Sequence, residues 1–108
     1  NTYINNKASI ISDGCKIKIG RNCLFGSNLQ IMDSDFHDLD PKGRFGGGVV
    51  LMSDITIEDN VFVGNNVTIL KGVTIGENSV VGNGSIVSNS IPKNVVAAGV
   101  PAVVLRSI

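Results

Sequence analysis

The 108-residue sequence has no tryptophan, one tyrosine and four phenylalanines. Aromatic rings carry much of the buried area in most protein cores, so this chain must build its core from other side chains. Hydrophobic residues make up 43% of the sequence, and most of them are isoleucine, valine and leucine. The composition therefore predicts a narrow interior that is filled by stacked aliphatic side chains.

The chain has no excess charge of either sign, because nine basic residues balance nine acidic ones. This balance argues against a nucleic acid or an anionic membrane as a partner bound through bulk electrostatics. No apolar run approaches the length of a membrane-spanning helix, and no signal peptide is visible. We therefore expect a cytoplasmic protein. The first residue is Asn1 rather than methionine, which is compatible with a missing N-terminal segment.

Residues with reactive side chains are scarce. The two cysteines, Cys15 and Cys23, have a spacing that matches no metal or redox motif, so we expect two small buried side chains. His37 is the only histidine. The sequence therefore predicts no metal site and no set of serine, histidine and aspartate residues for nucleophilic catalysis.

A six-residue repeat runs from Leu51 to Pro92. Its first position is always aliphatic: Leu51, Ile57, Val63, Ile69, Ile75, Val81 and Val87. Its fifth position is aliphatic or small: Ile55, Val61, Val67, Val73, Ser79, Ser85 and Ile91. Its fourth position is Asp, Asn, Gly or Ser: Asp54, Asn60, Asn66, Gly72, Asn78, Gly84 and Ser90. A regular repeat of this length indicates a parallel β-helix.

Six residues match one short strand and one corner. Three such units close a triangular coil of about eighteen residues, and successive coils stack at strand spacing, about 4.8 Å. The first-position side chains then point inward, the fifth position lies near the crowded corner, and Asn or Gly at the fourth position tolerates the positive φ of a tight turn. One coil cannot bury its apolar face alone, so the array must stack.

The repeat is less regular upstream and is interrupted once. Residues 19–31 keep the frame, with Ile19, Phe25 and Ile31 predicted to point inward and Cys23 and Leu29 at the corners. Before Ile19 the frame is ambiguous: Ile11 is inward together with either Cys15 or Ile17, and a slip or bulge is expected. Residues 33–50 break the repeat with acidic residues, Pro41 and three consecutive glycines, which predicts a loop that projects from one corner. The array ends at Ile91 and Pro92, residues 93–98 are predicted to leave the coil, and a short apolar tail over 93–108 is predicted to cover the last coil.

Four segments in this order resemble the hexapeptide-repeat acyltransferase superfamily, in particular its maltose, galactoside and nodulation O-acetyltransferase branch. They are IGRNCLFGSNLQI, the loop segment DSDFHDLD followed by Arg44, the long array, and the ending NVVAAGVPAVVLRSI. The resemblance implies an all-β fold, a left-handed parallel β-helix over residues 1–108. It also implies a homotrimer in which acetyl-CoA lies between two chains, so that each site draws residues from both.

The resemblance assigns the role of general base to His37, which would take the proton of an acceptor hydroxyl as that hydroxyl attacks the thioester. Asp35 is the best placed of four nearby aspartates either to orient the His37 ring or to bind an acceptor hydroxyl. Asn28, Arg44 and Phe62 match the acceptor side, although Asn28 is equally explained as a corner residue, and Arg44 as a residue that closes the loop or as a surface arginine. The implied cofactor residues are Gly64, Asn65, Asn83, Gly84, Ser88, Asn89 and Arg106.

The sequence departs from the family pattern at three of these places. Val103 and Asn89 stand where many relatives carry a cation that meets the phosphates of coenzyme A, which leaves Arg106 and Lys93 for that contact. Phe62 stands where the nearest relatives have tryptophan. The resulting prediction is an acetyl-CoA-dependent O-acetyltransferase acting on a sugar or glycan precursor. The alternatives are a non-catalytic trimerising β-helix module and an N-acetyltransferase acting on an amino sugar.

Overall fold

The computed structural model describes residues 1–108 as thirteen short strands and no helix. No segment therefore forms a helix with the length and apolarity needed to cross a membrane. The strands are β1 (Tyr3–Ile4), β2 (Ser9–Ile11), β3 (Ile17–Ile19), β4 (Leu24–Phe25), β5 (Gln30–Met32), β6 (Ile55–Ile57), β7 (Phe62–Val63), β8 (Thr68–Ile69), β9 (Thr74–Ile75), β10 (Val80–Val81), β11 (Ile86–Val87), β12 (Val95–Gly99) and β13 (Ala102–Ser107).

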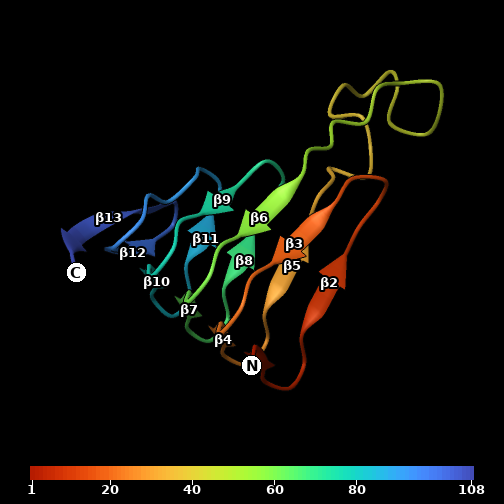
Figure 1. The fold of residues 1–108 in the computed structure, drawn as a ribbon. Helices are drawn as coiled ribbons and strands as arrows, with labels where there is room; N and C mark the ends of the chain where they lie inside the picture. The colour runs from red at the N-terminus through yellow and green to blue at the C-terminus, as the bar shows by residue number, and fades with distance from the viewer.

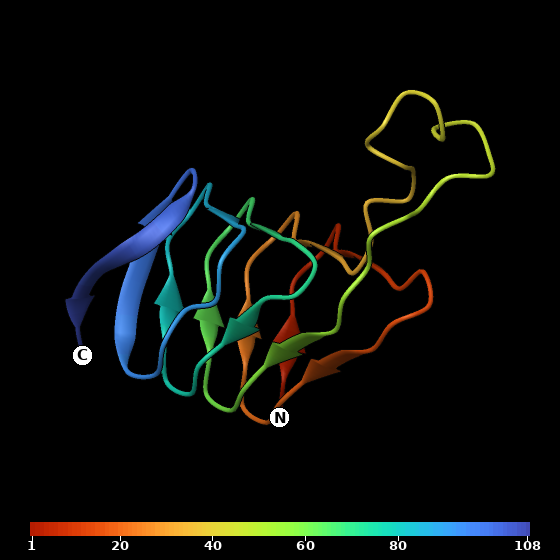
Figure 2. The ribbon, with the colours of Figure 1, turned by 90° about the horizontal axis from the view of Figure 1, so that it is seen from above.

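The strands form three sheets that are the three sides of a prism (Figure 1). Sheet A has the order β1-β4-β7-β10-β12-β13, sheet B the order β11-β8-β5-β2, and sheet C the order β3-β6-β9. All neighbours are parallel except β12 and β13. The chain visits sheets A, B and C in turn, so each circuit is one coil and the coils stack in a row (Figure 2).

The register confirms the predicted coil of eighteen residues. Val63 on β7 pairs with Val81 on β10, and Ile69 on β8 pairs with Val87 on β11. The amide of Asn65 donates to the side chain of Asn83, a residue eighteen positions later. Because the coils repeat at this interval, chemically equivalent residues lie directly above one another.

The predicted inward column forms the core. The first-position residues from Ile57 to Val87 are buried, and so is every fifth-position residue from Ile55 to Ile91, including Ser79 and Ser85. Phe25 and Ile31 are also buried, while Ile19 is half-buried at the N-terminal end of the stack. The side chains pack against their counterparts in the next coil, which supplies the burial that one coil lacks.

The corners carry the positive φ angles that the fourth position predicts. Asn60, Asn66 and Asn78 have φ angles of 60°, 57° and 66°, and Gly72 and Gly84 have angles of 78° and 73°. Asp54 and Ser90 lack a positive φ, so the prediction is wrong at these two positions. They stand at the two places where the chain re-enters or leaves the regular array, and the corner geometry relaxes there.

Two insertions interrupt the coil period, and both lie between sheets B and C. Cross-coil hydrogen bonds join residues 38 positions apart across the residue 33–54 segment, against 18 positions in the regular array. This segment is thus a coil corner enlarged by twenty residues, and it projects from the body (Figure 2). Hydrogen-bonded residues of the first and second coils are 21 positions apart in the sequence, three more than in the regular array. The three extra residues lie in the 12–16 turn. This turn is the slip expected before Ile19.

Two predictions about the edges of the loop and the first coil are wrong. Leu51 is 52% exposed, because the array resumes only at Ile55 and Leu51 still belongs to the loop. Ile10, rather than Ile11, takes the inward register, since it pairs with Ile31. Spacing alone did not resolve this register because the three extra residues follow β2 directly.

The prediction that residues 93–98 leave the coil is also wrong. Strand β12 continues sheet A in parallel with β10, through the pairs Val80 with Val96 and Val81 with Ala97. Strand β13 then folds back antiparallel to β12 and covers its outer edge. The tail therefore performs the predicted covering role, but as a full strand pair rather than as a turn.

The stacked aliphatic column predicts that two isoleucines of sheet B contribute very different amounts to the stability of the fold. Ile69 on β8 is fully buried, whereas Ile86 on β11 is 36% exposed. Ile69→Ala should lower the free energy of unfolding by about 2–4 kcal/mol, because it leaves a cavity between coils. Ile86→Ala is the matched control and should cost much less. Urea unfolding of both variants tests this, and equal losses would contradict the stacked column.

Candidate functional site

The enlarged corner carries the only histidine of the chain. We call residues 33–54 the loop, and residues 33–54, 70–73 and 88–91 together the BC corner, since each segment joins sheet B to sheet C. His37 is exposed within the loop. The loop projects from the prism, as the sequence predicted (Figure 2). The exposed imidazole is open to a partner.

The His37 ring has one contact within the chain. Its Nδ1 lies 3.3 Å from the backbone carbonyl oxygen of Arg44. A carbonyl oxygen only accepts, so in a neutral ring Nδ1 carries the proton and Nε2 keeps its lone pair. The Arg44 side chain donates from Nη2 to the carbonyl oxygen of Leu39 at 2.9 Å. This arginine therefore closes the loop, which was one of the roles predicted for it.

The loop has its own scaffold around Asp38. The Asp38 carboxylate accepts the amides of Asp40 at 2.9 Å and Val49 at 3.0 Å. Gly43 and Gly48 cross so closely that a Cβ on either would lie 2.6 Å from the Cα of the other, which explains why both are glycine. A pocket of about 320 Å³ opens in this loop beside His37, and its lining includes Phe36, Arg44 and Phe45.

The N-terminal stem of the loop is fixed by the fully buried Asp33. Its carboxylate accepts the hydroxyl of Ser12 at 2.7 Å and the amides of Asp13 at 2.7 Å and Cys15 at 3.1 Å. Burial alone would raise the pKa of Asp33, but these hydrogen bonds outweigh it and hold the pKa below the ordinary value. Burial and then the carboxylates of Asp54 and Asp33 raise the pKa of the Cys15 thiol, which keeps it protonated. The three-residue insertion of the first coil therefore serves as a socket for Asp33.

Asp35 has a partner that the sequence analysis missed. Its Oδ1 lies 2.9 Å from Nζ of Lys71, which stands at the BC corner of the next coil. The carboxylate therefore pairs with lysine, and no hydrogen bond joins it to the His37 ring. Lys71 could have been singled out from its place in the hexapeptide, because it occupies the corner position directly beside the loop.

Four of the predicted cofactor residues gather at another corner, which joins sheet A to sheet B. We call residues 26–29, 64–67 and 82–85 the AB corner. The amide of Asn65 donates to Oδ1 of Asn83 at 2.7 Å, and Oδ1 of Asn65 accepts the amide of Ser27 at 2.8 Å. Gly64 is buried and touches Asn83 so closely that a Cβ would collide with it. Gly84 has nothing within 4 Å of where a Cβ would stand, so its backbone faces open space.

The remaining predicted residues lie in three places. Ser88 and Asn89 are exposed at the BC corner, and Arg106 is exposed on β13. Asn28 lies at the AB corner, where its Nδ2 donates to Oδ1 of Asn66 at 2.8 Å and its φ is 60°, so its structural role as a corner residue is evident. Phe62 is 48% exposed on the outer face of sheet A.

Sheet B separates His37 from the AB corner. Gly84 and Ser88 flank strand β11, and the loop starts at the opposite end of β5 from Asn28. A side of about five extended residues spans roughly 16 Å. Within one chain the predicted base and these four predicted cofactor residues therefore lie on different corners.

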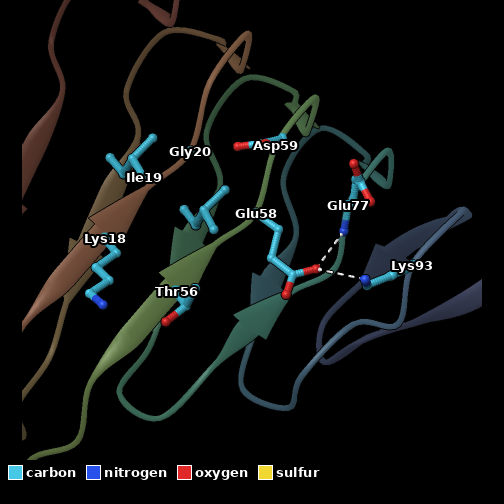
Figure 3. Close-up of a pocket in the computed structure, with 9 residues that line it drawn as sticks. Lys18, Ile19, Gly20, Thr56, Glu58, Asp59, Glu77 and Lys93 are labelled. Atoms are coloured by element: carbon cyan, nitrogen blue, oxygen red, sulfur yellow. Dashed lines mark hydrogen bonds and ion pairs between the residues drawn. The ribbon is translucent and has the colours of Figure 1, made fainter.

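A second hollow lies on sheet C, with a volume of about 560 Å³ (Figure 3). Its lining mixes both charges, with Lys18 and Lys93 against Glu58 and Glu77. Glu58 accepts the amide of Glu77 at 3.0 Å and lies 4.0 Å from Nζ of Lys93. The Glu58 carboxylate is thus already partnered. Of the residues singled out from the sequence for a functional site, only Lys93, expected to contact the phosphates of coenzyme A, lines this hollow.

Comparison with known proteins agrees with this architecture. The family model of the bacterial transferase hexapeptide repeat matches residues 54–89, and that of the hexapeptide repeat of succinyl-transferase matches residues 16–28. A hexapeptide-repeat acetyltransferase from Vibrio cholerae, solved with acetyl coenzyme A, superposes with a TM-score of 0.88 and 39% identity over 98% of this chain and 56% of its own. The chain belongs to the hexapeptide-repeat acyltransferase superfamily. The predicted left-handed parallel β-helix is thereby confirmed.

Two further relatives show the same pattern of coverage. A galactoside acetyltransferase solved with coenzyme A has a TM-score of 0.85 and 44% identity over 94% of this chain and 49% of its own. A candidate acetyltransferase from Dictyostelium discoideum is 43% identical over 103 residues, which are 95% of this chain and 53% of the relative. The chain thus spans about half the length of the curated relatives that it matches.

The socket of Asp33 predicts a pH-dependent contribution to stability. Because the folded pKa lies below the ordinary value of 3.8, the charged form stabilises the fold above that pH, and the contribution is lost as the pH falls through the folded pKa. Asp33→Asn should lower the midpoint of urea unfolding at pH 7. The difference from the unsubstituted protein should shrink as the pH falls below 3.8. A difference that stays constant with pH would contradict the assigned role.

Proposed function

We propose that this protein is an acetyl-CoA-dependent O-acetyltransferase that modifies a hydroxyl group of a sugar or glycan precursor. The observation that carries the proposal is an exposed single histidine, on a projecting loop, in a hexapeptide-repeat β-helix whose corner residue Gly84 leaves room for a ligand to approach the backbone. The relative that is named a galactoside acetyltransferase supports the sugar acceptor. Use of acetyl-CoA also suits the predicted cytoplasmic location.

The proposed chemistry needs only one side chain of the protein. Nε2 of His37 takes the proton of the acceptor hydroxyl as its oxygen attacks the thioester carbonyl. Coenzyme A then leaves as its thiol, so no covalent intermediate on the protein is required. A backbone N–H beside the thioester would donate to the oxyanion of the tetrahedral intermediate.

We further propose that the site forms between chains of a homotrimer. Sheet B separates the loop from the AB corner within one chain, so His37 and the four predicted cofactor residues of the AB corner meet only if a neighbouring chain supplies one of the two. The outer face of sheet A also favours assembly, because Tyr3, Leu24 and Phe62 expose 60%, 51% and 48% of their surfaces side by side across β1, β4 and β7. Contiguous exposed apolar surface is typical of an interface.

His37→Asn tests the base. The variant should keep its melting temperature and its binding of acetyl-CoA, measured by calorimetry, because the ring makes a single weak contact at 3.3 Å. Release of the coenzyme A thiol in the presence of a panel of sugars should fall by about 10²–10⁴-fold. Transfer that survives within a few-fold would refute the base. A failure of the unsubstituted protein to bind acetyl-CoA would favour the trimerising module instead.

Subunit mixing tests the site between chains. His37→Asn chains and Asn83→Arg chains, each inactive alone, are unfolded together and refolded. About a quarter of the unsubstituted activity should return, because half of the loops and half of the AB corners in random trimers are intact. The same two variants mixed without unfolding are the control and should stay inactive. No recovery after refolding would mean that both residues act within one chain.

A further inference from the structure

The turn that presents His37 has an unfavourable backbone conformation. Phe36 has a φ of +65°, which is rare for a bulky aromatic residue. The amide of His37 donates to the carbonyl oxygen of Asp35 at 2.7 Å, so residues 35–37 form a three-residue γ-turn. Such a turn persists only where the surrounding contacts hold it. The contacts on either side of Phe36 therefore decide how the imidazole is presented.

The N-terminal side of the turn is held by the first coil. The hydroxyl of Ser34 accepts the Phe36 amide at 2.8 Å and donates to the Asp13 carboxylate at 3.0 Å. Together with the Asp33 socket, these bonds hold Ser34 and the Phe36 amide. The Asp35 amide donates to the carbonyl oxygen of Leu51 at 3.0 Å, and the Asp35 side chain contacts Lys71 of the next coil.

The side chain of Asp35 is held by Lys71. The ion pair of 2.9 Å is partly shielded from water, with 18% of the Asp35 side chain and 33% of the Lys71 side chain exposed. The second oxygen of Asp35, Oδ2, is buried and has no hydrogen-bond partner. Lys71 is therefore the only cation that compensates this carboxylate. Its removal would leave a partly buried, unpaired charge, which moving Asp35 toward water would relieve.

We propose that Lys71 is a positioning residue: through its ion pair with Asp35 it holds the turn at Phe36 and so aims the His37 ring. The proposal rests on the proposed role of His37 as the base. It assigns Lys71 no contact with substrate or cofactor. The loop is then clamped from both neighbouring coils, by Asp13 on one side and Lys71 on the other, and the base stands between the two clamps.

Steady-state kinetics of Lys71→Met test the proposal. The variant should lose about tenfold to a hundredfold in kcat, because a misplaced base loses its near-attack geometry, while KM for acetyl-CoA stays the same. Lys71→Arg should recover most of the loss, since a cation is restored. Asp35→Asn should match Lys71→Met, and the double variant should be no worse than either, because both changes break one interaction. Lys42→Met, which removes an exposed loop lysine that forms no ion pair, is the matched control and should behave as the unsubstituted protein.

A raised KM for acetyl-CoA with unchanged kcat would overturn the proposal and make Lys71 a cofactor contact. Equal losses in Lys71→Met and Lys42→Met would also overturn it, because any change of loop charge would then suffice.

A spectroscopic readout separates this proposal from the proposed function. His37 is the only histidine, so the imidazole gives one set of proton signals that needs no assignment. Lys71→Met should shift or broaden these signals, and Lys42→Met and Lys71→Arg should leave them unchanged. This result does not depend on enzyme activity. If no acceptor is acetylated, the proposed function is refuted, but the positioning role of Lys71 is still supported by the shifted signals. Unchanged imidazole signals in Lys71→Met would refute the clamp, whatever the enzyme activity.

Discussion

The backbone ladder between stacked coils is the constraint on which the rest of this structure depends. Every strand is only a few residues long, and its parallel partners lie at least sixteen positions away in the sequence, so no strand is stable without the coil above or below it. The inward side chain of each coil must also match its counterparts, as Val63 matches Val81. Extra residues can therefore enter only at a corner, where they leave the ladder intact. Both insertions do so, and both lie between a strand of sheet B and a strand of sheet C.

A loop that leaves a rigid stack needs stems with their own polar contacts. A buried polar group without a partner costs free energy, so the two ends of the loop need hydrogen-bond donors and acceptors from their own residues or from neighbouring coils. The first coil supplies them through its three extra residues, whose Ser12 hydroxyl and Asp13 amide surround Asp33. The small insertion in the first coil and the large one in the second are thus parts of the same feature. One makes the socket and the other carries the histidine.

The repeat was sufficient to predict the coil, its inward column and the place of the loop, because a fixed period reports the register directly. It was insufficient at the edges of the array. Leu51 and residues 93–98 were misplaced because their position depends on the neighbouring strand and not on spacing. Within the site, the exposure of His37 followed from its place in the insertion. The ion pair between Asp35 and Lys71 could not be predicted, because the two residues are 36 positions apart and Asp35 lies in a segment without the six-residue repeat.

The four aspartates near His37 were candidates for its orienting partner, and the structure uses each of them elsewhere. Asp33 accepts three hydrogen bonds from the first coil, Asp38 accepts two within the loop, Asp40 accepts one from the next turn, and Asp35 pairs with lysine. The orienting acceptor of the ring is instead a backbone carbonyl oxygen. A neutral acceptor fixes the tautomer without placing a negative charge beside the imidazole. The acidic composition of the loop therefore reflects the cost of folding twenty extra residues onto a coil, and the proposed mechanism leaves the chemistry to one imidazole and a neighbouring chain.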